Sequence, residues 1–282
     1  KQGKLDWAGG DFSPLPLDAI PDLKKKYPMH SMPYGGTRYC ALNLNAFPFN
    51  NLALRKAFAI ATNRKKLIDF VGLTEDEVAT NVIASVFRQN QIKSLFPDGD
   101  KKLAQSYLQT ALKELQMKPE DLKITLKYEN SSLSHQLAQV LQQQWQETLG
   151  ITVSLEESEL KTLVNSFKKR DFQMGLIYWM VHYNSPMDIL DRYRAKDQMK
   201  NYPGWENKEF TRLLDLYFVE PKESEGNALL AKAEEIFINE MPAIPLYHFS
   251  SPYLCNPNLK NLHTTPTGDV FFTKAYLEKP KQ

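Results

Sequence analysis

Histidine, cysteine and acidic side chains are the first candidates for chemistry, because they include the usual general bases, nucleophiles and metal ligands. The five histidines stand alone in the sequence, without the His-x-x-x-His or Glu-x-x-His spacing of a metal site: His30, His135, His182, His248 and His263. There is no Gly-x-Ser-x-Gly turn, Gly-rich phosphate loop or dinucleotide fingerprint. The sequence therefore predicts a protein that is not an enzyme and that holds no metal or cofactor.

Acidic pairs and cysteines add little chemistry. Glu156-Glu157 and Glu234-Glu235 are adjacent carboxylates, but such pairs at polar ends of helices and strands are usually solvated, and we expect both at the surface. Cys40 and Cys255 are too few for a disulfide scaffold and lie in no thiol-protease context. One long-range disulfide and two free thiols both remain open, so cysteine usage does not decide the compartment.

The charges are balanced and dispersed. The 282 residues include 35 basic and 33 acidic side chains, with a net charge of +2, and this argues against the basic stripe of a nucleic-acid-binding protein. No apolar run is long enough to span a bilayer. The sequence opens with Lys1-Gln2-Gly3, without an initiator methionine or signal peptide, which predicts that an N-terminal part is missing here.

Hydrophobic periodicity predicts alternating helices and strands. The first 36 residues are rich in Pro and Gly and are predicted to be connecting segments, with one short helix at 18–26. Strands are predicted over 37–44, 122–128, 151–155, 171–179 and 243–248, with an irregular tail that has one strand or short helix near 271–276. Helices are predicted from Asn50 or Asn51 to about 61, from Thr74 (the capping-box spacing Thr74-x-x-Glu77), and over 100–117, 132–149, 158–169, 186–194, 208–219 and 224–241. This order predicts an α/β domain with a partly parallel sheet.

Five segments follow one another in a fixed order. They are Gly36-Thr37-Arg38-Tyr39 with Pro48-Phe49 and Arg55-Lys56-Ala57-Phe58-Ala59-Ile60-Ala61-Thr62-Asn63-Arg64; Leu141-(x)3-Trp145-(x)4-Gly150-Ile151; Arg170-Asp171-Phe172-(x)6-Trp179; Trp205-x-Asn207-(x)2-Phe210; and Met241-Pro242-Ala243-Ile244-Pro245. Together, over roughly residues 36–250, they resemble the oligopeptide-, dipeptide- and nickel-binding family of extracytoplasmic solute-binding proteins (family 5), and in particular its C-terminal half.

The resemblance implies a type II periplasmic-binding-protein fold in which two α/β lobes close on a ligand. Residues 1–36 would end the N-terminal lobe and form a hinge crossing, 37–245 the C-terminal ligand-binding lobe, and 246–282 the return crossing and tail. The implied function is a monomeric, non-enzymatic receptor in the periplasm or anchored at the bacterial surface, which hands oligopeptides to the permease of an ABC importer. Any membrane attachment would come from an N-terminal anchor.

The resemblance also implies ligand-binding residues. In enterobacterial relatives a cleft strand ends Trp-x-x-Asp, and the Asp pairs with the ligand's α-ammonium; here it ends Trp179-Met180-Val181-His182. Leu176 stands where those relatives have a ligand-facing Arg, and Leu160 replaces a pocket Trp. The implied lining residues are Trp179, His182, Tyr183, Asn184, Asp188, Glu159 and Leu160.

Several alternatives stay open from the sequence. His182 has no role if it is only an exposed residue at a strand end, Trp179 is equally typical of a core, and Asp188 also suits a helix dipole. Haem, a nickel chelate or a cell-wall peptide are rival ligands for the same fold, and an adhesion or sensing protein is a rival class.

Overall fold

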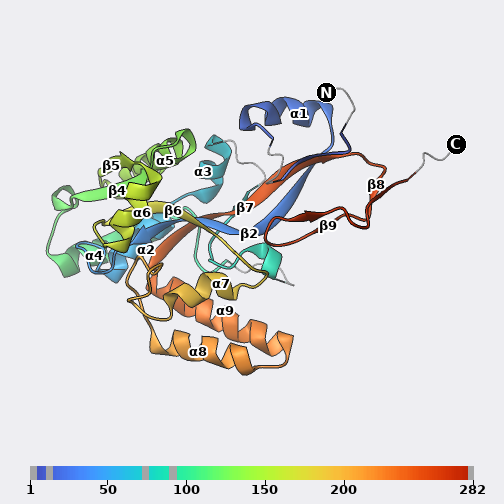
Figure 1. The fold of residues 1–282 in the computed structure, drawn as a ribbon. Helices are drawn as coiled ribbons and strands as arrows, with labels where there is room; N and C mark the ends of the chain where they lie inside the picture. Colours follow the sequence, from blue (N-terminus) through green and yellow to red (C-terminus); the bar gives the residue numbers. More distant parts are fainter. Residues whose placement is uncertain (1–4, 11–14, 72–75, 89–93, 279–282) are drawn as a thin grey trace.

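In the computed structural model, residues 5–10, 15–71, 76–88 and 94–278 are described. Their main feature is a seven-stranded mixed sheet with helices on both faces (Figure 1). The strands lie in the order β1 (Trp7–Gly9), β7 (Ala243–Cys255), β2 (Met29–Leu42), β6 (Met174–Met180), β4 (Ile124–Glu129) and β5 (Val153–Ser158), and β3 (Glu77–Val78) also pairs with β7. Strands β4, β5 and β6 are parallel, and the other pairs are antiparallel. The predicted α/β class with a partly parallel sheet is confirmed.

The two longest strands, β2 and β7, pair along nearly their whole length, from Met29 opposite Leu254 to Ala41 opposite Ala243. They leave the helical body together toward the end of the molecule where β8 (Leu259–Lys260) and β9 (His263–Thr264) lie (Figure 1). The prediction that 29–36 only connects is therefore wrong. Gly35 and Gly36 permit close packing: a Cβ at Gly36 would lie 2.4 Å from the ring of Phe249.

The helices divide between the two faces of the sheet. Alternate side chains of a strand point to opposite faces, so Arg38, which reaches Ser134 in α5, and Tyr39, which contacts Arg192 after α7, mark the two sides. One group comprises α2 (Leu52–Ala61), α3 (Arg64–Phe70), α4 (Lys101–Leu115) and α5 (Ser132–Leu149). The other comprises α6 (Leu160–Lys168), α7 (Met187–Leu190), α8 (Lys208–Val219) and α9 (Glu223–Glu240), with α7, α8 and α9 adjacent in Figure 1.

Local signals set most helix ends. Asn51, Asp100 and Ser131 each accept a hydrogen bond from the backbone three residues on, and so begin α2, α4 and α5. Gly150 has φ = 70°, the left-handed conformation that ends α5. These starts and this stop agree with the predictions made from the sequence.

Two helix predictions need correction, and one helix was missed. The short helix expected from Thr74 is absent from the described residues 76–88 apart from one 3-10 turn (Ser85–Phe87), and Thr74 itself lies outside them; Glu77 and Val78 instead pair with the free edge of β7. Helix 186–194 is reduced to α7 and a 3-10 turn (Asp191–Tyr193). The α1 helix (Ile20–Lys26) was expected, whereas α3 was not. At Glu77 and Val78, pairing with β7 outweighs local helix propensity.

The tail forms two small hairpin-like pairs instead of one further element. Strand β9 pairs with β10 (Val270–Phe271), and β8 pairs with β11 (Tyr276–Leu277). Both cysteines are free thiols; Cys40 is buried, and burial raises its pKa to about 12. Within the described ranges, no helix is both long and apolar enough to cross a membrane.

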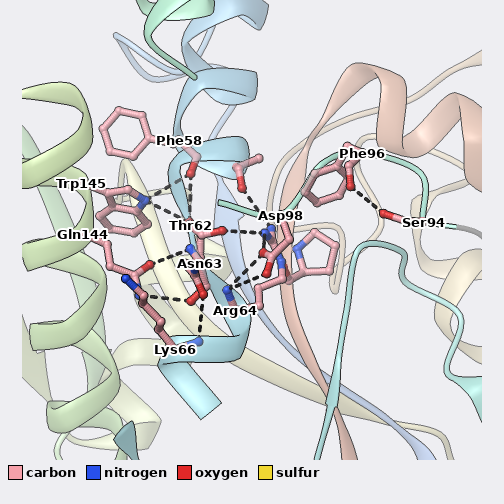
Figure 2. Close-up of polar contacts among 12 residues, drawn as sticks. Phe58, Thr62, Asn63, Arg64, Lys66, Ser94, Phe96, Asp98, Gln144 and Trp145 are labelled. Atoms are coloured by element: carbon pink, nitrogen blue, oxygen red, sulfur yellow. Dashed lines mark hydrogen bonds and ion pairs between the residues drawn. The ribbon is translucent and has the colours of Figure 1, made fainter. Parts of the chain in front are cut away.

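Arg64, the last residue of the first motif, ties α2 and α3 to β7 (Figure 2). Its side chain is fully buried and donates hydrogen bonds to the carbonyls of Pro245 (2.7 Å), Thr62 and Ala59. Asp98 pairs with it at 2.8 Å, so the buried charge is compensated. At Arg64, the first motif of the resemblance therefore stabilises the fold.

Candidate functional site at the carboxyl ends of the parallel strands

The parallel strands β4, β5 and β6 end at one edge of the sheet. Glu129 and Ser158 lie side by side there, and Met180 ends β6 on the other side of β4. The chain leaves β4 toward α5 on one face and leaves β5 toward α6 on the other, where Phe167 packs on Gly175. Connections that diverge to opposite faces open a crevice outside the carboxyl ends of the strands, which is where α/β sheets bind ligands.

The structure places all seven predicted lining residues at or just beyond this edge. Glu159 and Leu160 follow β5 and are exposed, Glu159 without a side-chain capping bond. Trp179 is near the end of β6, and the other four residues lie within the next nine positions: His182, Tyr183, Asn184 and Asp188. Because β4 separates β5 from β6, the seven residues form two groups at one edge.

Trp179, His182 and Asp188 form a contact group. The rings of Trp179 and His182 lie 4.9 Å apart, edge to face. Asp188 accepts hydrogen bonds from the His182 backbone and, at 3.0 Å, from its Nδ1. The His182 side chain is 62% exposed and that of Asp188 only 12%. Asp188 is therefore more than a favourable charge in the first turn of α7, because its carboxylate also contacts His182.

Tyr183 and Asn184 extend this group into solvent. Both are exposed, and partial burial, then Asp188 and Asp191, raise the pKa of Tyr183. Leu176, in contrast, is 1% exposed and belongs to the core. A ligand at this edge would meet the residues after position 178 and not Leu176.

Two cations on Trp179 were not predicted from the sequence. The Arg192 guanidinium carbon lies 3.1 Å from a ring centroid of Trp179, and the Lys200 ammonium lies 4.4 Å from it. Arg192 is buried and donates to the Tyr39 hydroxyl at 3.2 Å. No sequence signal pointed to this contact, because Arg192 lies in a segment of mixed charged and apolar residues, Ile189-Leu190-Asp191-Arg192-Tyr193-Arg194.

On the opposite face, Arg38 occupies a similar position. It is buried, lies 5.2 Å from the ring of Tyr178, and donates to Ser134 in the first turn of α5 at 3.4 Å. Tyr178 packs edge to face on Phe249 of β7. The end of β6 is thus bordered by a buried arginine on each face.

A second cluster of polar residues lies next to β7, away from the carboxyl ends of the parallel strands, and includes His248 of β7. Glu234 accepts hydrogen bonds from the backbone of Val82 and Ile83 and pairs with Arg88. Because Glu234 is 1% exposed, the prediction that this acid is solvated surface is wrong, whereas Glu156 and Glu157 are exposed as predicted. Burial, then Arg88, lowers the pKa of His248 to about 3, so this histidine is neutral. No cluster of metal-ligating side chains occurs among the residues that the structure describes.

Comparisons with known proteins agree on one family. Residues 1–201 match the family described as bacterial extracellular solute-binding proteins, family 5 middle. The oligopeptide-binding protein OppA of Bacillus subtilis is 34% identical over 280 residues, covering 98% of this chain and 51% of its own length. The dipeptide-binding protein DppE of the same organism is 27% identical, over 96% of this chain and 50% of its own.

Solved structures agree as well. The oligopeptide-binding protein OppAIV of Borrelia burgdorferi is similar with a TM-score of 0.79 and 25% identity, over 98% of this chain and 54% of that one. The murein tripeptide-binding protein MppA in its unliganded open form has a TM-score of 0.86 at 23% identity, over 98% and 53% of the two chains. The chain therefore spans about half the length of the relatives it matches.

Proposed function

Because this chain belongs to family 5 of the bacterial extracellular solute-binding proteins, we propose that it is the C-terminal part of a receptor that captures oligopeptides and delivers them to an ABC importer. The names of its relatives support this function, since they are oligopeptide- and dipeptide-binding proteins. The family is one of solute binding and not of catalysis. Periplasmic relatives, such as OppA of Salmonella typhimurium, support a site of action outside the cytoplasm.

The observation that carries the proposal is the group at the end of β6, in which Trp179 is half-buried and the other residues are exposed. Trp179, His182, Tyr183 and Asn184 present an aromatic and polar surface beside the half-buried carboxylate of Asp188. A peptide can bind along such a strand end with main-chain hydrogen bonds, while its side chains enter neighbouring pockets. Glu159 and Leu160 complete the surface from β5.

The paired strands β2 and β7 fit the proposed division into lobes. Residues 1–36 and 246–282 then belong to the hinge and to contacts with an N-terminal lobe, and 37–245 form the ligand-binding lobe. Two long strands that leave one body side by side can bend together, as a hinge requires. Closure of the lobes would cover the end of β6.

Asp188 is the proposed partner of the ligand's α-ammonium. His182 replaces the acid of enterobacterial relatives and offers no negative charge when neutral, but it holds Asp188 at 3.0 Å. A buried ion pair loses several kcal/mol when one partner is removed. The position of the Asp188 carboxylate against His182 is the observation that favours this pairing over the alternative that the preferred ligands are N-acylated.

The test uses the full-length protein and matched free and N-acetylated peptides in calorimetry. Asp188→Asn should weaken binding of the free-amine peptide at least tenfold (about 1.4 kcal/mol) and leave the acetylated peptide unaffected. Asp191→Asn is the matched control, because Asp191 pairs with Arg194 instead. Equal losses for both peptides in Asp188→Asn would exclude this role, and no peptide found by mass spectrometry with the purified protein would argue against peptide capture.

A further inference from the structure

Trp179 carries two positive charges at the proposed ligand edge. The Arg192 guanidinium and the Lys200 ammonium lie 3.1 and 4.4 Å from a centroid of the same indole. Each contact is favourable alone, because a cation is attracted to the face of an aromatic ring. Two cations on one ring repel each other, however, and the repulsion grows where protein displaces water. The two cations together therefore favour an anion in direct contact with them.

No carboxylate of the described residues supplies that charge. Among the described residues, neither Arg192 nor Lys200 has an ion-pair partner. The two nearby acids in the sequence pair elsewhere, Asp191 with Arg194 and Asp188 with His182. Arg192 is only 6% exposed, and its neighbours are the hydroxyls of tyrosines such as Tyr39.

Three buried N–H donors in this group also have no acceptor among the described residues. They are Nε and Nη2 of Arg192 and Nε1 of Trp179. Buried donors are nearly always hydrogen-bonded, so a group of three at one place points to an acceptor from outside the described chain. A guanidinium and an ammonium that contact one indole favour a carboxylate, which can accept several charge-assisted hydrogen bonds.

We propose that Arg192, Lys200 and Trp179 form a carboxylate subsite that selects peptides with an acidic group near the amino end. The inference rests on the proposed function. Lys200 is exposed and Trp179 is half-buried, so a carboxylate can reach Lys200 from solvent. The three donors of Arg192 and Trp179 are buried, so the carboxylate reaches them only if these side chains move when ligand binds. His182, whose ring is 4.9 Å from Trp179, links this subsite to Asp188, so the ammonium and the carboxylate would bind close together. That spacing suits an acidic side chain at one of the first ligand residues.

The probes are pentapeptides of alanine with Glu or Gln at the second position, each with a free or an amidated C-terminus. Calorimetry with the full-length protein should show the Glu peptide binding about tenfold tighter than the Gln peptide, the ratio expected for one charge-assisted contact. Lys200→Met should reduce the ratio to near one, and Lys200→Arg should restore part of it. Lys196→Met is the matched control: Lys196 pairs with Glu206, and the ratio should persist.

The four peptides separate the two sources of a carboxylate. If the ligand's main-chain carboxylate is the group bound, amidation lowers affinity in the wild type and not in Lys200→Met, and the acidic-side-chain assignment is overturned. Arg192→Met is measured in parallel with its thermal unfolding, so that a folding defect is not taken for lost recognition. Equal affinity for the Glu and Gln peptides overturns the proposal while leaving peptide capture intact. Failure of all four peptides to bind the wild type counts against the proposed function itself.

Discussion

Arg64 and Arg192 are both buried, but the chain compensates their charges differently. Arg64 lies between α2, α3 and β7, with three backbone carbonyls and Asp98 around its guanidinium (Figure 2). Arg192 lies at the proposed ligand edge, with tyrosine hydroxyls around it and no carboxylate partner among the described residues. A buried charge is stable when its hydrogen bonds are satisfied and costly when they are not. The first arrangement suits a brace of the fold, and the second suits a group that meets its partner only when ligand arrives.

The largest expected effect comes from removing the compensated arginine. Arg64→Met leaves the carbonyl of Pro245 without its side-chain donor and the Asp98 carboxylate without its positively charged partner, although the backbone N–H of residue 64 still donates to Asp98. We expect the free energy of unfolding to fall by about 3–5 kcal/mol. Denaturant unfolding measures it. Arg212→Met, which removes an exposed pair with Glu209, should cost less than about 1 kcal/mol. A similar loss of stability in Arg64→Met and Arg212→Met would contradict the view that Arg64 stabilises the fold through its buried contacts.

His248 gives a second effect, which depends on pH. Its pKa is lowered to about 3 by burial, then by Arg88, whereas in the unfolded chain it is near the usual 6.5. Between these two values the unfolded state binds a proton that the folded state does not, so this contribution to stability is complete above pH 6.5 and is lost as pH falls toward 3. Between these pH values the free energy of unfolding changes by up to about 1.4 kcal/mol per pH unit because of this histidine.

Unfolding curves at pH 7.5, 5.5 and 4.5 measure this slope. The variant His248→Gln should be less stable at pH 7.5 and should show a shallower loss with acid than the wild type. A slope unchanged by the substitution would mean that other groups cause the acid sensitivity. The result would show whether the stability of the polar cluster next to β7 requires His248 to be neutral.

The smallest expected effect on stability is at the uncompensated arginine. Arg192→Met removes a buried charge that has no carboxylate partner in the described part of the chain and leaves an apolar stem against Trp179. We expect the free energy of unfolding to change by no more than about 1 kcal/mol, because apolar replacements of buried charges are often neutral or stabilising. Thermal unfolding beside Arg64→Met measures this difference. A loss as large as that of Arg64→Met would make Arg192 a brace of the fold as well.

Much of the fold could be predicted from the sequence because its signals are local. The caps Asn51, Asp100 and Ser131 and the glycine at position 150 lie within a few residues of the helices they bound. The resemblance also implied a hinge crossing within residues 1–36 and a return crossing within 246–282, and β2 and β7 pair along these stretches. Where prediction failed, a distant partner was decisive: Glu77 and Val78 became a strand because β7 had a free edge.

The site was predictable in part. Trp179, His182 and Asp188 came from the spacing of one motif, and the structure places them in contact. Arg192 and Lys200 could not be found in this way, because they reach Trp179 through the turns after α7 and not through a sequence period. Periodicity indicates which side of an element is buried but does not identify the element that packs against it.

By itself, the sequence determined the alternation of helices and strands, most helix ends and the family, since each depends on residues close together along the chain. Only the tertiary structure decided which charges are compensated. It buried Glu234 against the backbone of Val82 and Ile83, gave Arg64 its partner Asp98, and left Arg192 on Trp179 without an acid among the described residues. Compensation depends on distances between groups far apart in the chain, and these are fixed only when the sheet and its two layers of helices pack together.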